Sequence, residues 1–413
     1  MKNAASFLHP DFAAMFSRIT REFIEQWWET PISFPEGLAV FTRREQKAKG
    51  RELDAYLNRA AGQLSAEVTA AAREANLKSA ARAFAAQAFA GDWEGRDPAF
   101  LDDFATVTED FVHEARRFDP GLKMDDVAQA LRNLWIGNSL QVYLEKPVTM
   151  TPGLFAYSML YPYTDNYLDD ASVPADGKQG FSRWFAARLA GEPVAIGNEY
   201  QDKLSRLVAM VEEQYSRVEY RDVYQSLLAI HQAQEDALTQ QNRTACPYET
   251  DLLGLSFAKG GASVLADGYL VKGDLTEAEM RFVMGFGIFL QLIDDLQDLP
   301  GDRRHGHMTV FSQVAGGWPL DNLTNRLLRF TSDVLDGTGR FVTPQNQQLK
   351  SLIAQNCLLL IQEAISRQKG FFCRSYLGRM QACLPLRPRA MAGIARKVKK
   401  LRGGFKSGWD TEA

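Results

Sequence analysis

Cysteine, histidine and long apolar runs are scarce in this sequence, and each shortage argues against a class of protein. The four cysteines are widely separated among 413 residues, so neither a disulfide framework nor a cysteine zinc site is indicated. The five histidines form no H-E-x-x-H or E-x-x-H pattern, which removes the usual ligands of zinc proteases and paired di-iron sites. We therefore expect any metal ion to be held by carboxylates.

No segment has the length or composition of a membrane span. The longest apolar run, Phe282 to Ile293, has about twelve residues, whereas a spanning helix needs roughly 20. The N-terminus lacks a continuous apolar core followed by a small-residue cleavage site, because His9, Pro10 and Asp11 interrupt it. These absences predict a cytoplasmic protein.

Positive charge is concentrated at the C-terminal end of an acidic chain. The net charge is −4, yet residues 387–409 carry eight Lys and Arg and no Asp or Glu. We call residues 387–413 the basic tail. Such a stretch suits a peripheral contact with an anionic membrane surface, and a solvated, frayed C-terminus is the alternative. We expect no nucleic-acid partner.

Helical character dominates the chain and no series of alternating strand-like segments interrupts it. Helix-forming segments rich in Ala, Leu, Arg, Glu and Gln lie at 51–91, 204–215, 223–241, 277–299 and 345–373. Breaks rich in Pro, Gly or Asp lie at 91–98, 119–123, 172–180, 191–193, 300–306 and 316–319. The pattern predicts one large all-α domain over residues 1–413, in which residues 1–120 are a candidate added helical layer.

Two aspartate clusters, 129 residues apart, stand out. The first is Asp165-Asn-Tyr-Leu-Asp169-Asp170, and the second is Asp294-Asp295-Leu-Gln-Asp298. Each cluster contains two aspartates four residues apart, Asp165 with Asp169 and Asp294 with Asp298, and this spacing places both carboxylates on one face of a helix. Like charges at this spacing repel, and the second cluster lies in an apolar helix where burial makes them costlier. A divalent cation is the natural neutraliser, and carboxylates with water and phosphate oxygens suit Mg²⁺.

Basic side chains near the clusters are candidate ligands for a phosphate or diphosphate. Arg303, Arg304 and His307 follow the second cluster in a predicted Pro/Gly loop, where capping of a helix end is the alternative role. Lys259 precedes Gly260 and Gly261 in an apolar stretch, and the glycines permit close approach of a ligand or of another helix.

These residues resemble motifs of the class I isoprenoid synthases, the all-α family of prenyl diphosphate synthases and terpene synthases. The run from Gly287 through Gln291 to Asp298 resembles the second aspartate-rich motif of trans-prenyltransferases, with Leu290 in place of a phenylalanine. Asp165 to Asp169 is similar to the first motif, and Lys259-Gly260 resembles a Lys-Thr helix break that contacts diphosphate. The resemblance covers roughly residues 150–312.

The resemblance implies a class I isoprenoid synthase helical bundle with a central active-site cavity. It implies about three Mg²⁺ ions, replaceable by Mn²⁺, held by Asp165, Asp169, Asp294 and Asp298 with help from Asp170 and Asp295. It also implies that the diphosphate of a prenyl diphosphate substrate is bound by Gln291, Lys259, Arg303, Arg304 and His307. Dimerisation is common in the family, so a homodimer is left open.

Two tyrosines before the first cluster are candidates for the wall of a prenyl pocket. Tyr161 and Tyr157 precede Asp165 by one and two helical turns, and aromatic rings stabilise a carbocation through cation–π attraction. Tyr161 takes the position that limits chain length in elongating relatives, unless Pro162 kinks the helix or begins a new one. An ordinary core role for both tyrosines is the alternative.

Departures from the family pattern decide between activities. The Gly-Gly-Lys-Arg and Arg-Arg-Gly stretches that hold isopentenyl diphosphate in chain-elongating members are missing. The sequence therefore favours a terpene synthase that ionises one prenyl diphosphate. A prenyltransferase that joins two isoprenoids is the second hypothesis, and a non-catalytic prenyl diphosphate-binding protein is the third. Prenyl chain length and product skeleton depend on cavity contour and stay open.

Overall fold

The chain forms an all-helical structure, as the sequence predicts. The computed structural model describes residues 4–64, 100–170, 172–241, 246, 248–337, 343–387, 390, 393 and 396, and among them no β-strand occurs. The α-helices are α1 (Pro10–Glu29), α2 (Arg43–Leu64), α4 (Phe100–Phe118), α5 (Met124–Tyr143), α6 (Pro152–Asp169), α7 (Ala175–Ala190), α8 (Glu199–Gln214), α9 (Arg221–Ala237), α10 (Leu252–Lys272), α11 (Glu277–His305), α12 (Val310–Val314), α13 (Asp321–Asp336), α14 (Pro344–Arg367) and α15 (Arg374–Ala382).

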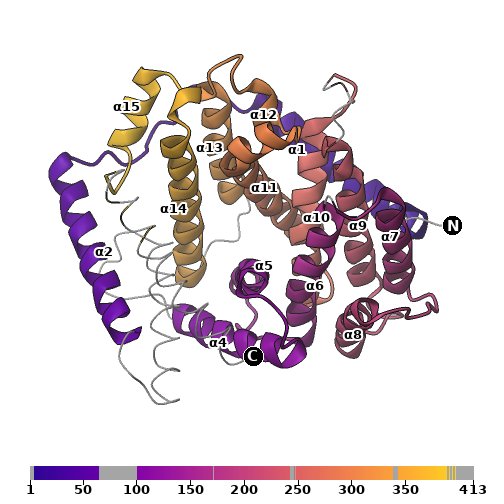
Figure 1. The fold of residues 1–413 in the computed structure, drawn as a ribbon. Coiled ribbons are helices and arrows are strands. Elements are labelled where there is room, and N and C mark those ends of the chain that lie inside the picture. Colours follow the sequence, from indigo (N-terminus) through magenta and orange to yellow (C-terminus); the bar gives the residue numbers. More distant parts are fainter. Residues whose placement is uncertain are drawn as a thin grey trace.

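Helix α5 occupies the centre of the bundle. Figure 1 shows it end-on, with α4, α6, α11 and α14 placed around it. It packs directly against α4, α6, α10 and α14, and α10 and α11 pack along each other beside it. Most of the residues on α5 between Val127 and Tyr143 are consequently buried. The helices that carry the two aspartate clusters, α6 and α11, are therefore neighbours of the same central helix and of α10.

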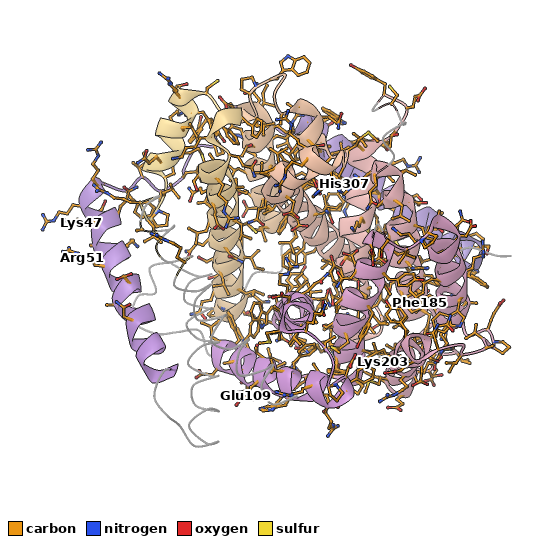
Figure 2. All side chains as sticks on the ribbon, in the orientation of Figure 1. Lys47, Arg51, Glu109, Phe185, Lys203 and His307 are labelled. Atoms are coloured by element: carbon orange, nitrogen blue, oxygen red, sulfur yellow. The ribbon has the colours of Figure 1, made fainter. Side chains whose placement is uncertain are left out.

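Helix α2 stands at one edge of the molecule. The side chains of Lys47 and Arg51 point outward from it (Figure 2). On its inner face the Gln46 amide donates to the carbonyl oxygens of Gln381 and Leu384, at 2.9 and 2.8 Å. Helix α2 thus joins the N-terminal part of the chain to the segment after α15.

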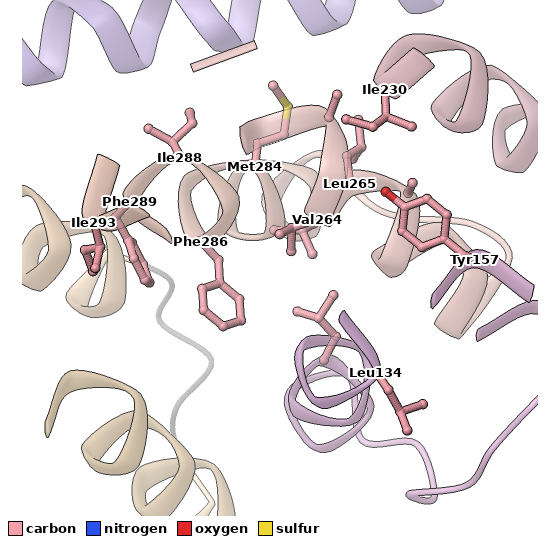
Figure 3. Packing of buried hydrophobic residues seen from close by; sticks show 14 of the residues in the cluster. Leu134, Tyr157, Ile230, Val264, Leu265, Met284, Phe286, Ile288, Phe289 and Ile293 are labelled. Carbon is pink, nitrogen blue, oxygen red and sulfur yellow. The ribbon is translucent and has the colours of Figure 1, made fainter. Parts of the chain in front are cut away.

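One hydrophobic cluster extends through the bundle, from Phe12 to Met380. Figure 3 shows its middle, where side chains of α10 and α11 interleave with those of α5, α6 and α9. Trp27 of α1 packs edge-to-face against Phe257 of α10 and Phe330 of α13, with ring centroids 6.1 and 5.6 Å apart. Because α1 and α4 contribute to this cluster, these two helices of the N-terminal 120 residues share the core of the remaining helices, whereas none of the described side chains of α2 belongs to it.

The predicted break at 300–306 is wrong, because α11 continues through Pro300 to His305. A proline inside a helix leaves the carbonyl four residues earlier without its donor. Here that carbonyl belongs to Leu296, and the side-chain amide of Gln368, just after α14, donates to it at 2.8 Å and to Gln297 O at 3.2 Å. A tertiary contact therefore replaces the lost helical hydrogen bond. The predicted break at 172–180 is also partly wrong, because α7 begins at Ala175.

Other predicted breaks are confirmed, and some expectations lie outside the described residues. Helices end before 119–123, 191–193 and 316–319, and Gly191 adopts a left-handed conformation at φ 82°. Of the predicted helix 51–91, residues 51–64 belong to α2, and the rest lies outside the described residues. Most of the basic tail also lies outside them. In the part of the chain that is described, no helix is both long and apolar enough to cross a membrane.

Candidate functional site

Helices α10 and α11 meet through two glycines, and this contact sets the geometry of the site. A Cβ atom on Gly260 would lie 2.5 Å from the carbonyl oxygen of Gly287, and one on Gly287 would collide with the carbonyl oxygen of Gly260. Only residues without side chains allow the two backbones to approach so closely. The contact brings the residues beside Gly260, notably Ser256 and Lys259, next to the acidic turns of α11.

Asp295 is the buried acid of the second cluster. Its exposed fraction is 6%, and its carboxylate accepts hydrogen bonds from Ser256 Oγ at 2.9 Å and from Gln291 Nε2 at 2.8 Å. Burial raises the pKa of Asp295 to about 6, although both hydrogen bonds favour the ionised form. Gln291, predicted to contact diphosphate, thus orients a carboxylate of the cluster in this structure.

Asp294 combines solvent access with a strongly perturbed acidity. Its side chain is exposed, yet burial among protein atoms, followed by the charges of Asp298 and Asp295, raises its pKa to about 7. Lys259 and Arg132 oppose this rise. An exposed carboxylate with a raised pKa indicates that the group lies in a recess where negative charge is in excess.

Asp298 continues the acidic face of α11 toward Asp302 and His307. Burial and the charge of Asp302 raise the pKa of Asp298, and Arg132 and His307 oppose the rise. Asp302 lies four residues after Asp298, almost on the same face of the helix. The distance from His307 Nδ1 to Asp302 Oδ1 is 3.4 Å, and this hydrogen bond raises the pKa of His307. The contact with Asp302 thus favours the protonated form of His307, the residue labelled in Figure 2.

The first cluster meets the second through Lys259. The Nζ atom of Lys259 on α10 lies 3.7 Å from Oδ1 of Asp165 on α6. The charge of Lys259 also opposes the raised pKa values of Asp294 and Asp295, so its ammonium group faces acids from both clusters. The structure thus brings together three side chains predicted from the sequence, on three helices: Asp165, Lys259 and Asp294.

Other residues of the first cluster are placed differently. Asn166 donates to Asp126 Oδ1 on α5 at 3.2 Å. Asp170 is exposed after the end of α6, where its carboxylate accepts from the backbone N–H of Ser172 at 2.8 Å, and its pKa is lowered. Asp170 therefore caps a turn and is not brought into the acidic cluster. The Asp169 side chain lies outside the described part of the chain.

Arg132 on α5 is a charged group at the site that the sequence analysis missed. The pKa values of Asp294, Asp298 and Tyr161 are all raised, and the positive charge of Arg132 opposes each of these rises. It belongs to no recognisable motif, so only its neighbourhood in the fold reveals it. Ser256 was missed for the same reason, whereas Asp302 follows the second aspartate-rich motif in a Gly-Asp pair that was given no role at the site. The one available signal was Arg132-Asn133, a polar pair inside a largely apolar helix.

Arg303 and Arg304 are not placed at the acidic cluster, which corrects the expectation that a loop folds them over an anion. Because α11 continues past Pro300, they project about 140° and 120° away from Asp298 around the helix axis. The guanidinium of Arg303 lies 5.0 Å from the ring centroid of Phe371, and Arg304 Nε donates to Pro300 O at 3.1 Å. Both arginines therefore make their contacts at the exposed C-terminal end of α11.

Tyr157 and Tyr161 lie below the first cluster on α6, which continues through Pro162 without a break. Tyr157 is buried, and its hydroxyl donates to Ser263 O at 3.0 Å. The charge of Asp165 and burial raise the pKa of Tyr161, so its hydroxyl stays protonated. Both tyrosines line a small cavity of about 20 Å³, which is room for about one water molecule. This cavity is far smaller than the several hundred Å³ of a typical ligand pocket.

The donor set fits Mg²⁺ in its usual mode of binding. In the described residues, no three His, Cys, Asp or Glu side chains stand close enough to enclose a metal ion by themselves. Mg²⁺ is ordinarily held by one or two carboxylates together with water and substrate phosphates, so it needs no such cage. Asp165, Asp294 and Asp298 are oxygen donors, and the raised pKa of Asp294 measures an excess of negative charge that a cation would relieve.

Comparisons with known proteins identify no relative of this chain. No protein-family model matches it, and a search of curated proteins found no significant match. The function has to be argued from the residues and their geometry.

Proposed function

We propose that this protein is a Mg²⁺-dependent class I terpene synthase that ionises a linear prenyl diphosphate, releases diphosphate, and lets the carbocation cyclise or lose a proton. The observation that supports it is the convergence of the two aspartate clusters on Lys259, with Asp165 at 3.7 Å and Asp294 held at a pKa of about 7. The excess carboxylates suit a metal cation, and the lysine and arginine beside them suit an anion bound to that metal.

The metal would be held by Asp165, Asp294 and Asp298, with Mn²⁺ as a substitute for Mg²⁺. When bound, it supplies positive charge against the oxygen atoms of the departing diphosphate. Lys259 and Arg132 add fixed cations at the same place, and His307 adds a third through its contact with Asp302. Cations fixed where negative charge develops lower the barrier to ionisation.

The prenyl chain would extend from the acids along α6 toward Tyr161. The ring of Tyr161 offers the carbocation an electron-rich surface worth roughly 0.5–2 kcal/mol. Because the cavity beside Tyr157 and Tyr161 holds about 20 Å³, binding of the chain requires the side chains around it to move. Product skeleton then depends on how far they move.

The experiment that tests this function measures diphosphate release from geranyl, farnesyl, geranylgeranyl and geranylfarnesyl diphosphates, supplied one at a time with Mg²⁺. We expect release from one of them, with formation of a hydrocarbon or alcohol. Asp294→Asn is the inactive variant. Asp333→Asn on α13 is its matched control, because burial also raises the pKa of Asp333, which lies outside the site.

Other outcomes of that experiment identify the two remaining hypotheses. Release only after addition of isopentenyl diphosphate, with a longer diphosphate as product, would replace the synthase by a prenyltransferase. Mg²⁺-dependent binding of all four compounds without any release would replace it by a binding protein.

A further inference from the structure

A second cluster of buried polar groups lies on α7 and α9, outside the acidic site. Ser182 of α7 donates its hydroxyl to Glu235 Oε1 at 2.6 Å, and the same hydroxyl oxygen lies 2.9 Å from His231 Nε2. The ring of Phe185, labelled in Figure 2, packs perpendicular to the imidazole with centroids 5.1 Å apart. His231 is 1% exposed, so its protonation and hydrogen bonding are set by these neighbours.

The surroundings of His231 fix which ring nitrogen carries the proton. Nε2 lies 3.1 Å from the carbonyl oxygen of Ser182, which can only accept a hydrogen bond. Nε2 is therefore the protonated nitrogen, and Nδ1 presents a lone pair. In the described part of the chain Nδ1 has no hydrogen-bond partner, although it is buried. A buried acceptor without a partner costs about 1–3 kcal/mol, unless a water molecule satisfies it.

The cavity beside His231 has the size and lining that such a water needs. It measures about 20 Å³, and its walls include Tyr157, Tyr161, Phe185, Ile230, His231 and Gln234. A buried water occupies a space of about this size and makes two to four hydrogen bonds. Besides His231, the lining includes Gln234 and Tyr161, whose side chains carry an amide and a hydroxyl group.

The cavity lies on the path that a prenyl chain bound at the acids would take. Tyr161 and Tyr157 are one and two turns from Asp165 on the same helix, which corresponds to about 6 and 12 Å along the axis. Figure 3 shows that Tyr157 of α6 and Ile230 of α9 approach the same part of α10, near Leu265. The cavity is therefore lined both by tyrosines one and two turns from Asp165 on α6 and by His231 of α9.

We propose that His231 Nδ1 holds a single water molecule in this cavity and that His231 is the base which takes its proton when the water adds to the carbocation. The inference rests on the proposed function. The water oxygen forms a bond to the cationic carbon, one O–H bond breaks, and the proton moves to Nδ1. The product is a terpene alcohol, and the carboxylate of Glu235 balances the charge of the imidazolium.

The electrostatics of the cluster suit this role. Burial lowers the pKa of His231, so its imidazole is neutral and able to accept a proton. The charge of Glu235 acts in the opposite direction and favours the protonated form once it is made. Ser182 Oγ donates to one oxygen of this carboxylate, Oε1, and in the described part of the chain the other oxygen, Oε2, has no hydrogen-bond partner.

Two measurements test the proposal. The first is a high-resolution crystal structure of the wild-type protein, in which we expect an ordered water within hydrogen-bond distance of His231 Nδ1. The second is turnover in H₂¹⁸O, with products analysed by mass spectrometry. We expect one ¹⁸O atom in the wild-type product and, in His231→Leu, at least a tenfold shift from alcohol to hydrocarbon with diphosphate release within about threefold of wild type.

His231→Gln keeps a polar side chain that can hold the water but cannot take its proton, so its alcohol fraction falls between those of wild type and His231→Leu. His113→Leu, which alters an exposed histidine on α4, is the matched control and leaves the products unchanged. An empty cavity in the crystal structure overturns the proposal even if the leucine variant fails to fold. Diphosphate release with an unlabelled hydrocarbon in wild type overturns it while leaving the synthase intact, whereas no release at all removes the proposed function.

Discussion

The carboxylates of Glu212 and Asp294 have opposite surroundings. Glu212 on α8 receives two hydrogen bonds from Arg188 of α7, at 2.7 and 2.8 Å, and two from Arg217, at 2.7 Å from Nη2 and 3.0 Å from Nε. Burial opposes its ionisation, yet the two arginines outweigh burial and lower its pKa. At Asp294, burial and neighbouring acids raise the pKa to about 7, against the partial opposition of Arg132 and Lys259.

The contrast is the one we expect between a structural acid and a functional one. Around Glu212 the charges are balanced within the protein, and the ion pairs connect α7 to α8. Around Asp294 the acids outnumber the cations, which leaves the metal-free site in an unfavourable state that a bound cation would improve. We therefore expect substitution at Glu212 to lower stability with little effect on activity, and substitution at Asp294 to do the reverse.

The largest expected effect is that of Asp294→Asn on turnover. The amide keeps the shape of the side chain but removes a metal-binding charge, so we expect diphosphate release to fall by about 10²- to 10³-fold. The melting temperature should stay unchanged or rise, because a disfavoured charge is removed. A large drop in melting temperature would contradict the functional assignment, since it would make Asp294 a structural acid like Glu212.

The next effect is that of Glu212→Gln on stability. Removing the charge leaves Arg188 and Arg217 half-buried without their partner, and we expect a loss of about 2 kcal/mol in the free energy of unfolding by urea titration. Diphosphate release at 25 °C should stay within about twofold of wild type. Glu213→Gln, one residue later on the same helix, is the control. Equal losses in both variants would show that the arginine pairs carry no special weight.

Arg132→Leu sharpens the comparison from the side of the cations. It removes a charge that opposes the raised pKa values of Asp294 and Asp298, and a candidate ligand of the diphosphate. We expect diphosphate release to fall about tenfold, equivalent to about 1.4 kcal/mol. Arg117→Leu on α4 is the matched control, since Arg117 is exposed and pairs only locally with Glu114. Equal activity in the two variants would place Arg132 outside the site.

The smallest effect concerns the pH dependence of stability without divalent cations. Between pH 4.5 and 7 the folded protein holds a proton at Asp294 that the unfolded chain has lost, so Asp294 makes the free energy of unfolding decrease as pH rises. Glu212 acts oppositely, since its lowered pKa stabilises the fold above about pH 4.5 and this contribution is lost on acidification. Urea titrations at pH 5 and 7 in EDTA should show that wild type loses about 1 kcal/mol more than Asp294→Asn after allowance for solvent screening. The same change in the free energy of unfolding between pH 5 and 7 in wild type and in Asp294→Asn would refute the excess of negative charge at Asp294.

Much of the fold and part of the site could be predicted from the sequence, because the relevant signals are local. Helical periodicity and the spacing of four residues in each aspartate cluster depend only on nearby positions. Lys259 was found because a charge beside glycines in an apolar stretch is unusual, and the structure explains the glycines through the contact between Gly260 and Gly287. The roles of Asp165, Lys259 and Asp294 in catalysis stay predictions.

What the sequence did not predict depends on contacts between distant segments. Pro300 looked like a helix end because a proline removes one helical hydrogen bond. In the structure that bond is replaced by one from Gln368, a residue in no motif. That error placed Arg303 and Arg304 in a loop over the acids, whereas the helix that continues to His305 turns them about 140° and 120° away from Asp298. Arg132 was missed for the converse reason: its neighbours are charged residues of α11, more than 160 positions later.

The hydrogen bonds from Gln368 to α11 also bear on how this chain can be divided. A fragment that ends at residue 310 would contain every aspartate, lysine and tyrosine of the predicted site. It would nevertheless lack the donor that lets α11 pass Pro300, and with it the turn on which Asp302 positions His307. The boundary of the folded unit that carries the predicted site is therefore set by a side chain 70 residues beyond Asp298, where the last motif ends. A truncation directly after the motifs would keep the predicted site residues and lose a contact that shapes the helix carrying them.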